Sequence, residues 1–114
     1  MYRFEKLRVF SHAMDLVEEI YRITKLLPKE ERFALIDQIR RSVISVVLNI
    51  AEGAGGLGDK EYQSFLRISL KSLYETVAGL MIARRLYKID VSVALEKCDV
   101  IGKELNALIN SFKK

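Results

Sequence analysis

Residues 43–51 read Val-Ile-Ser-Val-Val-Leu-Asn-Ile-Ala, and seven of these nine residues are apolar. Wound into a helix, the stretch places apolar side chains on every side, so no face is left to meet water. A small bundle gives each helix only one inner face to bury. We therefore expect Ile44, Val47 and Leu48 to lie at an interface between subunits of an oligomer.

Breaks in the sequence on both sides of this stretch divide the chain into helical segments. Pro28, the glycine-rich run Gly53–Gly58 and Ile89-Asp90 separate four stretches in which apolar residues recur every three or four positions. The expected helices span about 11–27, 29–52, 59–88 and 91–112. Four helices joined by short loops predict an all-α, antiparallel up-and-down four-helix bundle in which residues 1–114 form one domain.

The periodicity also predicts which side chains form the core. The second helix should bury a stripe that begins at Phe33 and continues through Ile36 and Ile39. The third helix carries Ser69, Thr76 and Ala83 on its inner stripe, seven residues apart. Small residues at this spacing would let a neighbouring helix approach closely.

Composition excludes several classes of protein. The 114 residues include 19 Lys and Arg against 15 Asp and Glu, which gives 19 − 15 = +4. The single Cys98 cannot form an intramolecular disulfide, and the single His12 leaves no His/Cys cluster for zinc. The longest uncharged run, residues 42–51, is too short to cross a membrane, and the charged N-terminus does not resemble a signal peptide. We expect a reduced, cytoplasmic protein.

A row of basic residues follows the outer side of the third helix. At 100° per residue, five cations gather in one stripe around Tyr74. They are Lys60, Arg67, Lys71, Arg85 and Lys88. Such a row can track the phosphates of RNA or DNA and release their counterions. The alternative is an ordinary solvated helix face with a positive bias.

Other motifs point weakly to chemistry. Gly53–Gly58 matches the spacing of a dinucleotide-binding loop, but no other strand-like segment would pair with the run before it, and Asp59 would repel a pyrophosphate. A flexible connection between helices explains the glycines better. Cys98 falls on an inner stripe as an inert thiol, and no Asp is spaced to orient His12. We therefore expect no enzyme, no catalytic residue, no cofactor and no metal.

The segment Asn49-Ile-Ala-Glu-Gly53, placed after Gln38-Ile-Arg-Arg41, resembles the four helix bundle protein family encoded in intervening sequences of bacterial 23S ribosomal RNA genes. The downstream Glu61-Tyr62-x-x-Phe65-Leu66-x-Ile68 resembles it too. The resemblance implies a homopentameric ring. It also implies similarity to the accessory variability determinant protein of diversity-generating retroelements, a basic pentamer that binds nucleic acid and a reverse transcriptase.

Five polar residues match polar positions of that family, and we expect them to form a buried or interfacial network, because polar groups inside apolar helices need partners. They are Gln38, Arg41, Asn49, Glu52 and Glu75. Glu52 and Glu75 are also the expected ion-pair partners of Arg40 and Arg41. The function expected is a non-enzymatic oligomer that binds nucleic acid. The alternative is an adaptor ring that docks a partner protein such as a reverse transcriptase.

Overall fold

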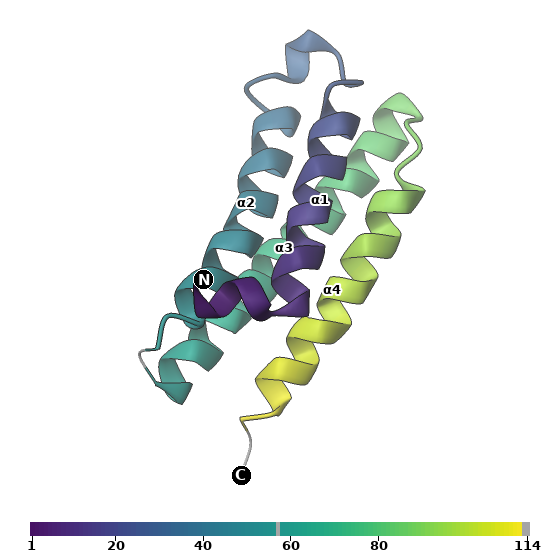
Figure 1. Ribbon diagram of the computed structural model, residues 1–114. Helices are drawn as coiled ribbons and strands as arrows, with labels where there is room; N and C mark the ends of the chain where they lie inside the picture. The colour runs from purple at the N-terminus through teal and green to yellow at the C-terminus, as the bar shows by residue number, and fades with distance from the viewer. Residues whose placement is uncertain (57, 113–114) are drawn as a thin grey trace.

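Helices account for all regular secondary structure in the computed structural model, which describes residues 1–56 and 58–112 (Figure 1). The elements are η1 Arg3–Lys6, α1 Arg8–Thr24, η2 Lys29–Glu31, α2 Leu35–Gly53, α3 Asp59–Tyr87 and α4 Ser92–Asn110, where η marks a short 3-10 helix. Each long helix packs against its neighbours in a closed cycle, with α1 against α2 and α4, and α3 against α2 and α4. The expected four-helix bundle is confirmed.

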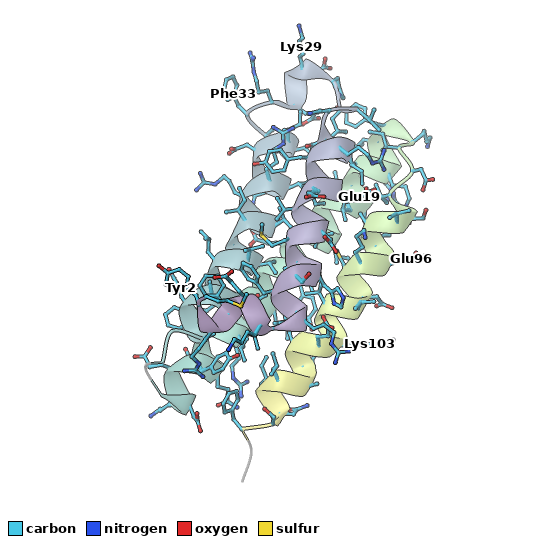
Figure 2. All side chains as sticks on the ribbon, viewed as in Figure 1. Tyr2, Glu19, Lys29, Phe33, Glu96 and Lys103 are labelled. Atoms are coloured by element: carbon cyan, nitrogen blue, oxygen red, sulfur yellow. The ribbon has the colours of Figure 1, made fainter. Side chains whose placement is uncertain are left out.

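The core lies along the bundle axis and follows most of the predicted stripes. Leu16 and Ile20 of α1, Leu80 of α3 and Ile101 of α4 are fully buried. Phe33 is the exception, because its side chain is 86% exposed at the end of the bundle (Figure 2). The prediction that Phe33 belongs to the core was wrong.

The second helix begins later than predicted, at Leu35 instead of residue 29. Residues Lys29–Glu31 form η2, and Glu31 then accepts a hydrogen bond from the Tyr87 hydroxyl (2.5 Å) and one from the Leu35 N–H (3.3 Å). The bond to Glu31 raises the pKa of Tyr87 to about 12. The hydrogen bond from Tyr87 of α3 fixes residues 29–34 in a turn. Phe33 therefore precedes α2, and its side chain points outward.

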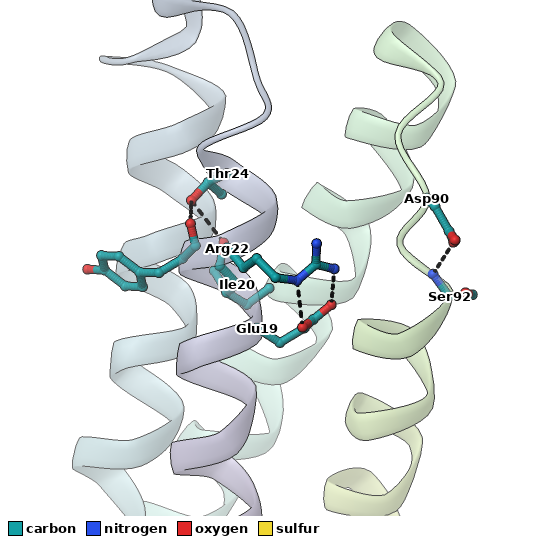
Figure 3. A network of polar contacts seen from close by, with 7 residues as sticks. Glu19, Ile20, Arg22, Thr24, Asp90 and Ser92 are labelled. Carbon is teal, nitrogen blue, oxygen red and sulfur yellow. Dashed lines mark hydrogen bonds and ion pairs between the residues drawn. The ribbon is translucent and has the colours of Figure 1, made fainter.

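The other helix ends lie within three residues of the expected bounds. The first helix starts at Arg8, ahead of the expected residue 11, and ends at Thr24. Gly58, with φ +107°, occupies the cap position before α3, and Asp59 is the first helical residue. At the start of α4, Asp90 accepts a hydrogen bond from the Ser92 N–H at 3.0 Å (Figure 3). Leu57 lies outside the described residues.

Hydroxyl groups join α2 to α3 along their buried contact. Ser42 and Thr76 share a hydrogen bond of 2.8 Å, and so do Ser45 and Ser72. Ser69 donates to the Val46 carbonyl oxygen at 2.8 Å. Short hydroxyl side chains bond across the contact only when the two helices are close, so the predicted close approach at Ser69 and Thr76 is confirmed.

Gly79 brings α2 and α3 closest. A Cβ placed on Gly79 would lie 2.6 Å from Cγ1 of Ile39, which is fully buried in α2. Real carbon atoms do not approach so closely, and the Cγ1 of a β-branched residue in a helix has little freedom to move. Glycine is therefore required sterically at this point, and α3 is held firmly along the bundle.

Candidate functional site

The basic face consists of Lys60, Arg67, Lys71, Arg85 and Lys88. All five side chains are exposed, and α3 carries the first four of them along its 29 uninterrupted helical residues. From Lys60 to Arg85 the row covers 25 helical steps, or about 38 Å at 1.5 Å per residue. Lys88 follows the last helical residue in a left-handed conformation (φ 57°), where it caps α3. Helical geometry thus places Lys60, Arg67, Lys71 and Arg85 on one side of α3, and Lys88 follows at its C-terminal end.

Carboxylates do not neutralise this face. Within residues 1–56 and 58–112, the close ion pairs join Arg22 to Glu19 and His12 to Glu104, and neither involves a residue of the basic face. Arg22 donates to Glu19 at 2.6 Å and lowers the pKa of that carboxyl below its ordinary value (Figure 3). Glu75, the nearest acid on α3, instead accepts a hydrogen bond from Gln38 Nε2 at 2.8 Å.

A groove of about 680 Å³ lies between α3 and α4, on one flank of the basic face. Tyr74 and Met81 line it from α3, and Gly102 contributes no side chain to it from α4. Tyr74 is 58% exposed, so its ring is available from solvent. Sequence reasoning placed Tyr74 among the cations but did not find the groove, because a groove depends on how two helices pack.

The five-residue polar network is only partly assembled. Gln38 and Glu75 bond across α2 and α3, as expected. Asn49 instead donates to the carbonyl oxygen of Ser45 in its own helix at 2.8 Å, and Arg41 and Glu52 are exposed. The hydroxyls of Ser42, Ser45, Ser69, Ser72 and Thr76 occupy the buried contact in its place.

Arg40 does not bond to either expected carboxylate. Its Nε donates to Thr24 Oγ1 at 2.8 Å, and its guanidinium carbon lies 4.3 Å from the centre of the Tyr21 ring. A guanidinium over an aromatic face is a favourable cation–π arrangement. The prediction that Arg40 pairs with Glu52 or Glu75 was wrong, and its contacts join α1 to α2.

The expected interface residues divide into two groups. Val47 is only 8% exposed and packs in the core of its own chain, whereas Ile44 and Leu48 are 37% and 54% exposed. The expectation that other subunits cover these three residues stays a prediction. Ile68, Ile82 and Leu86 of α3 are exposed as well.

The structure shows the surroundings of Cys98 and His12, the two side chains that the sequence offered for chemistry. Burial raises the pKa of the Cys98 thiol to about 12, so the reactive thiolate is scarce at neutral pH. His12 Nδ1 lies 2.9 Å from both Glu104 carboxylate oxygens, a partner that sequence reasoning missed because the two residues come from opposite ends of the chain. No group of three or more possible metal ligands occurs in the described part of the chain. Nor does any helix among those residues have the length and apolarity to cross a membrane.

Comparisons with known proteins agree with the fold. The model of the family "23S rRNA-intervening sequence protein" matches residues 5–110. A crystal structure from Bacteroides thetaiotaomicron, described as a protein with unknown function from the S23 ribosomal protein family, is similar with a TM-score of 0.80 and 25% sequence identity. The alignment covers 89% of this chain and 97% of that one. No curated protein matches the sequence.

Proposed function

The chain belongs to the 23S rRNA-intervening sequence protein family, and we propose that it acts as a non-enzymatic, oligomeric bundle that binds the phosphates of RNA or DNA in the cytoplasm. The observation that carries the proposal is the basic face, whose five exposed cations form no ion pair with a carboxylate among the described residues. The net charge of +4 and the isoelectric point near 9.3 favour the same ligand.

The contacts available to this face are with phosphates and not with base edges. Lys and Arg that reach phosphates position a nucleic acid but carry no sequence information. The five side chains would displace counterions along about 38 Å of helix, from Lys60 to Arg85 and on to Lys88. Binding is therefore expected to depend steeply on salt and weakly on sequence.

A salt titration tests the proposal directly. Fluorescence anisotropy with a labelled oligonucleotide of mixed sequence should show affinity falling as salt rises, with a slope of log affinity against log salt between about −3 and −5 for five phosphate contacts. A scrambled sequence should give the same slope. Absence of binding at low salt, or binding that salt leaves unchanged, would show that the basic face is only a solvated helix surface.

Oligomerisation is the second part of the proposal. Ile44 and Leu48 of α2 are exposed apolar side chains on the long helix pair α2/α3, and Ile68, Ile82 and Leu86 extend the exposed apolar surface onto α3. Burial of such surface against a second copy is favourable. Repeating the basic face around a ring would multiply its field, and the resemblance to the accessory variability determinant protein favours five copies.

Replacing Leu48 by Lys should split the oligomer. The native particle is expected to be a multiple of 13.1 kDa by size-exclusion chromatography with light scattering, five-fold for a pentamer, after nuclease treatment. A charge at Leu48 would be buried without a partner in the interface, so the particle mass should fall. Val100→Lys on α4, an exposed apolar residue of similar accessibility (47%), is the control and should leave the mass unchanged. A native monomer would end this part of the proposal.

The groove between α3 and α4 favours a second candidate function, that of an adaptor. Exposed apolar side chains such as Met81 beside a groove can hold a partner protein, for example a reverse transcriptase. The adaptor predicts that a protein co-purifies with the chain after nuclease treatment, whereas the nucleic-acid function predicts that nuclease removes what is bound.

A further inference from the structure

The row of cations on α3 is interrupted near the middle of the helix. Lys71 and Arg85 lie within about 40° of each other around the helix and are 85 − 71 = 14 residues apart, which is about 21 Å along its axis. Ala78 stands between them on the same side and brings no charge. The exposed ring of Tyr74 and the thioether of Met81 lie beside this gap, on the flank toward α4. The aromatic ring of Tyr74 thus lies beside the part of the row that has no cation.

The groove next to Tyr74 differs in character from the basic face. Leu73, Val77 and Leu95 give it apolar walls, and Gly102 leaves it open on the α4 side. Its volume of about 680 Å³ is in the range of sites that hold small flat ligands. The groove also has charged side chains along its walls, with Arg84 on α3 and Glu96, Asp99 and Lys103 on α4, and Figure 2 shows Glu96 and Lys103 projecting from that helix.

This distribution of charge would orient a bound strand. Lys71, Arg85 and the groove-lining Arg84 of α3 attract phosphates, whereas Glu96 and Asp99 of α4 repel them and Lys103 offsets only one of these two charges. A sugar–phosphate backbone would therefore follow α3 in preference to α4. The bases of that strand would then turn from α3 toward the groove. Only an unpaired base offers its flat face to an aromatic ring, because in a duplex that face is stacked on its neighbours.

We propose that the groove between α3 and α4 takes unpaired nucleobases, with Tyr74 as the ring on which a base stacks, so that the protein prefers single-stranded nucleic acid to duplex. The proposal rests on the proposed function and names the ligand class of the same face. The cations supply sequence-independent affinity, and Tyr74 supplies the preference for a single strand.

The test compares one labelled strand of about 16 nucleotides with its own duplex, using the full chain at constant salt. The native protein should bind the single strand about 10-fold more tightly. Tyr74→Ala should lose about 10-fold in affinity for the single strand and leave duplex binding unchanged, while Tyr74→Phe should retain the preference because it keeps the ring. Phe33→Ala, which removes the 86% exposed aromatic at the end of the bundle, is the control and should have no effect.

The outcomes separate this proposal from the one on which it rests. Equal affinity for strand and duplex, or a Tyr74→Ala variant that binds like the native protein, overturns the stacking site and leaves phosphate binding intact. Loss of all binding in the native protein overturns both proposals. A change in particle mass in Tyr74→Ala would show that a second subunit covers the groove, which also overturns the stacking site.

Discussion

Replacing both Arg67 and Lys71 by Glu is expected to weaken nucleic-acid binding about 100-fold at low salt. The two residues are four apart on α3, so their side chains are neighbours on the exposed surface. The double substitution removes two phosphate contacts and places two negative charges in the middle of the basic face. The slope of log affinity against log salt should fall by about 1.5, and the difference from the native protein should shrink as salt rises.

Lys25→Glu combined with Lys29→Glu is the matched control for this prediction. These two lysines are also exposed and four apart, but they lie at the end of α1 and in η2. Both double variants lower the net charge from +4 to 0. If they lose affinity equally, net charge alone governs binding and α3 has no special role. A loss confined to Arg67 and Lys71 would locate the contact on the basic face.

Local patterns were sufficient to predict most of the fold. Recurrence of apolar residues at helical spacing and clear breaks at Gly53–Gly58 and Ile89-Asp90 predicted four helices and most of their buried residues. The start of α2 could not be predicted in this way, because the apolar pattern continues through Phe33 into residues that are not helical. The turn there depends on the hydrogen bond between Glu31 and Tyr87, which are 56 residues apart.

For the candidate site too, features that depend on one helix could be predicted, and features that depend on contacts between helices could not. The basic face follows from helical geometry alone, since an unbroken helix fixes which residues share a side. The groove beside Tyr74 and the pairing of His12 with Glu104 require knowledge of how helices pack against one another. Residue types alone also did not show that serine and threonine hydroxyls would bond between α2 and α3. Any role of Arg41, Asn49 and Glu52 at an interface between subunits stays a prediction.

The close contact between α2 and α3 also leads to a prediction about stability, for the substitution of Gly79 by Ala. Alanine favours a helix by about 1 kcal/mol over glycine, so propensity alone predicts stabilisation. The new Cβ, however, would lie 2.6 Å from Ile39 Cγ1. Either Ile39 leaves its preferred rotamer or α2 and α3 separate, which strains the bond between Ser42 and Thr76. Overpacking of this kind costs about 1–3 kcal/mol, so after the gain in helix propensity we expect a net loss of about 1 kcal/mol in urea unfolding.

Removing the Ile39 side chain should make Gly79→Ala stabilising instead of destabilising. Ile39→Ala costs about 2–5 kcal/mol by itself, because the residue is fully buried. In that background no Cγ1 opposes the new methyl group, so Gly79→Ala should stabilise the chain by up to about 1 kcal/mol. Gly102→Ala on α4 is the control, since its Cβ would meet Leu73 Cδ2 at an ordinary 3.5 Å and should also stabilise. If Gly79→Ala destabilises both backgrounds equally, the clash with Ile39 is not what requires glycine, and the spacing of α2 and α3 has another cause.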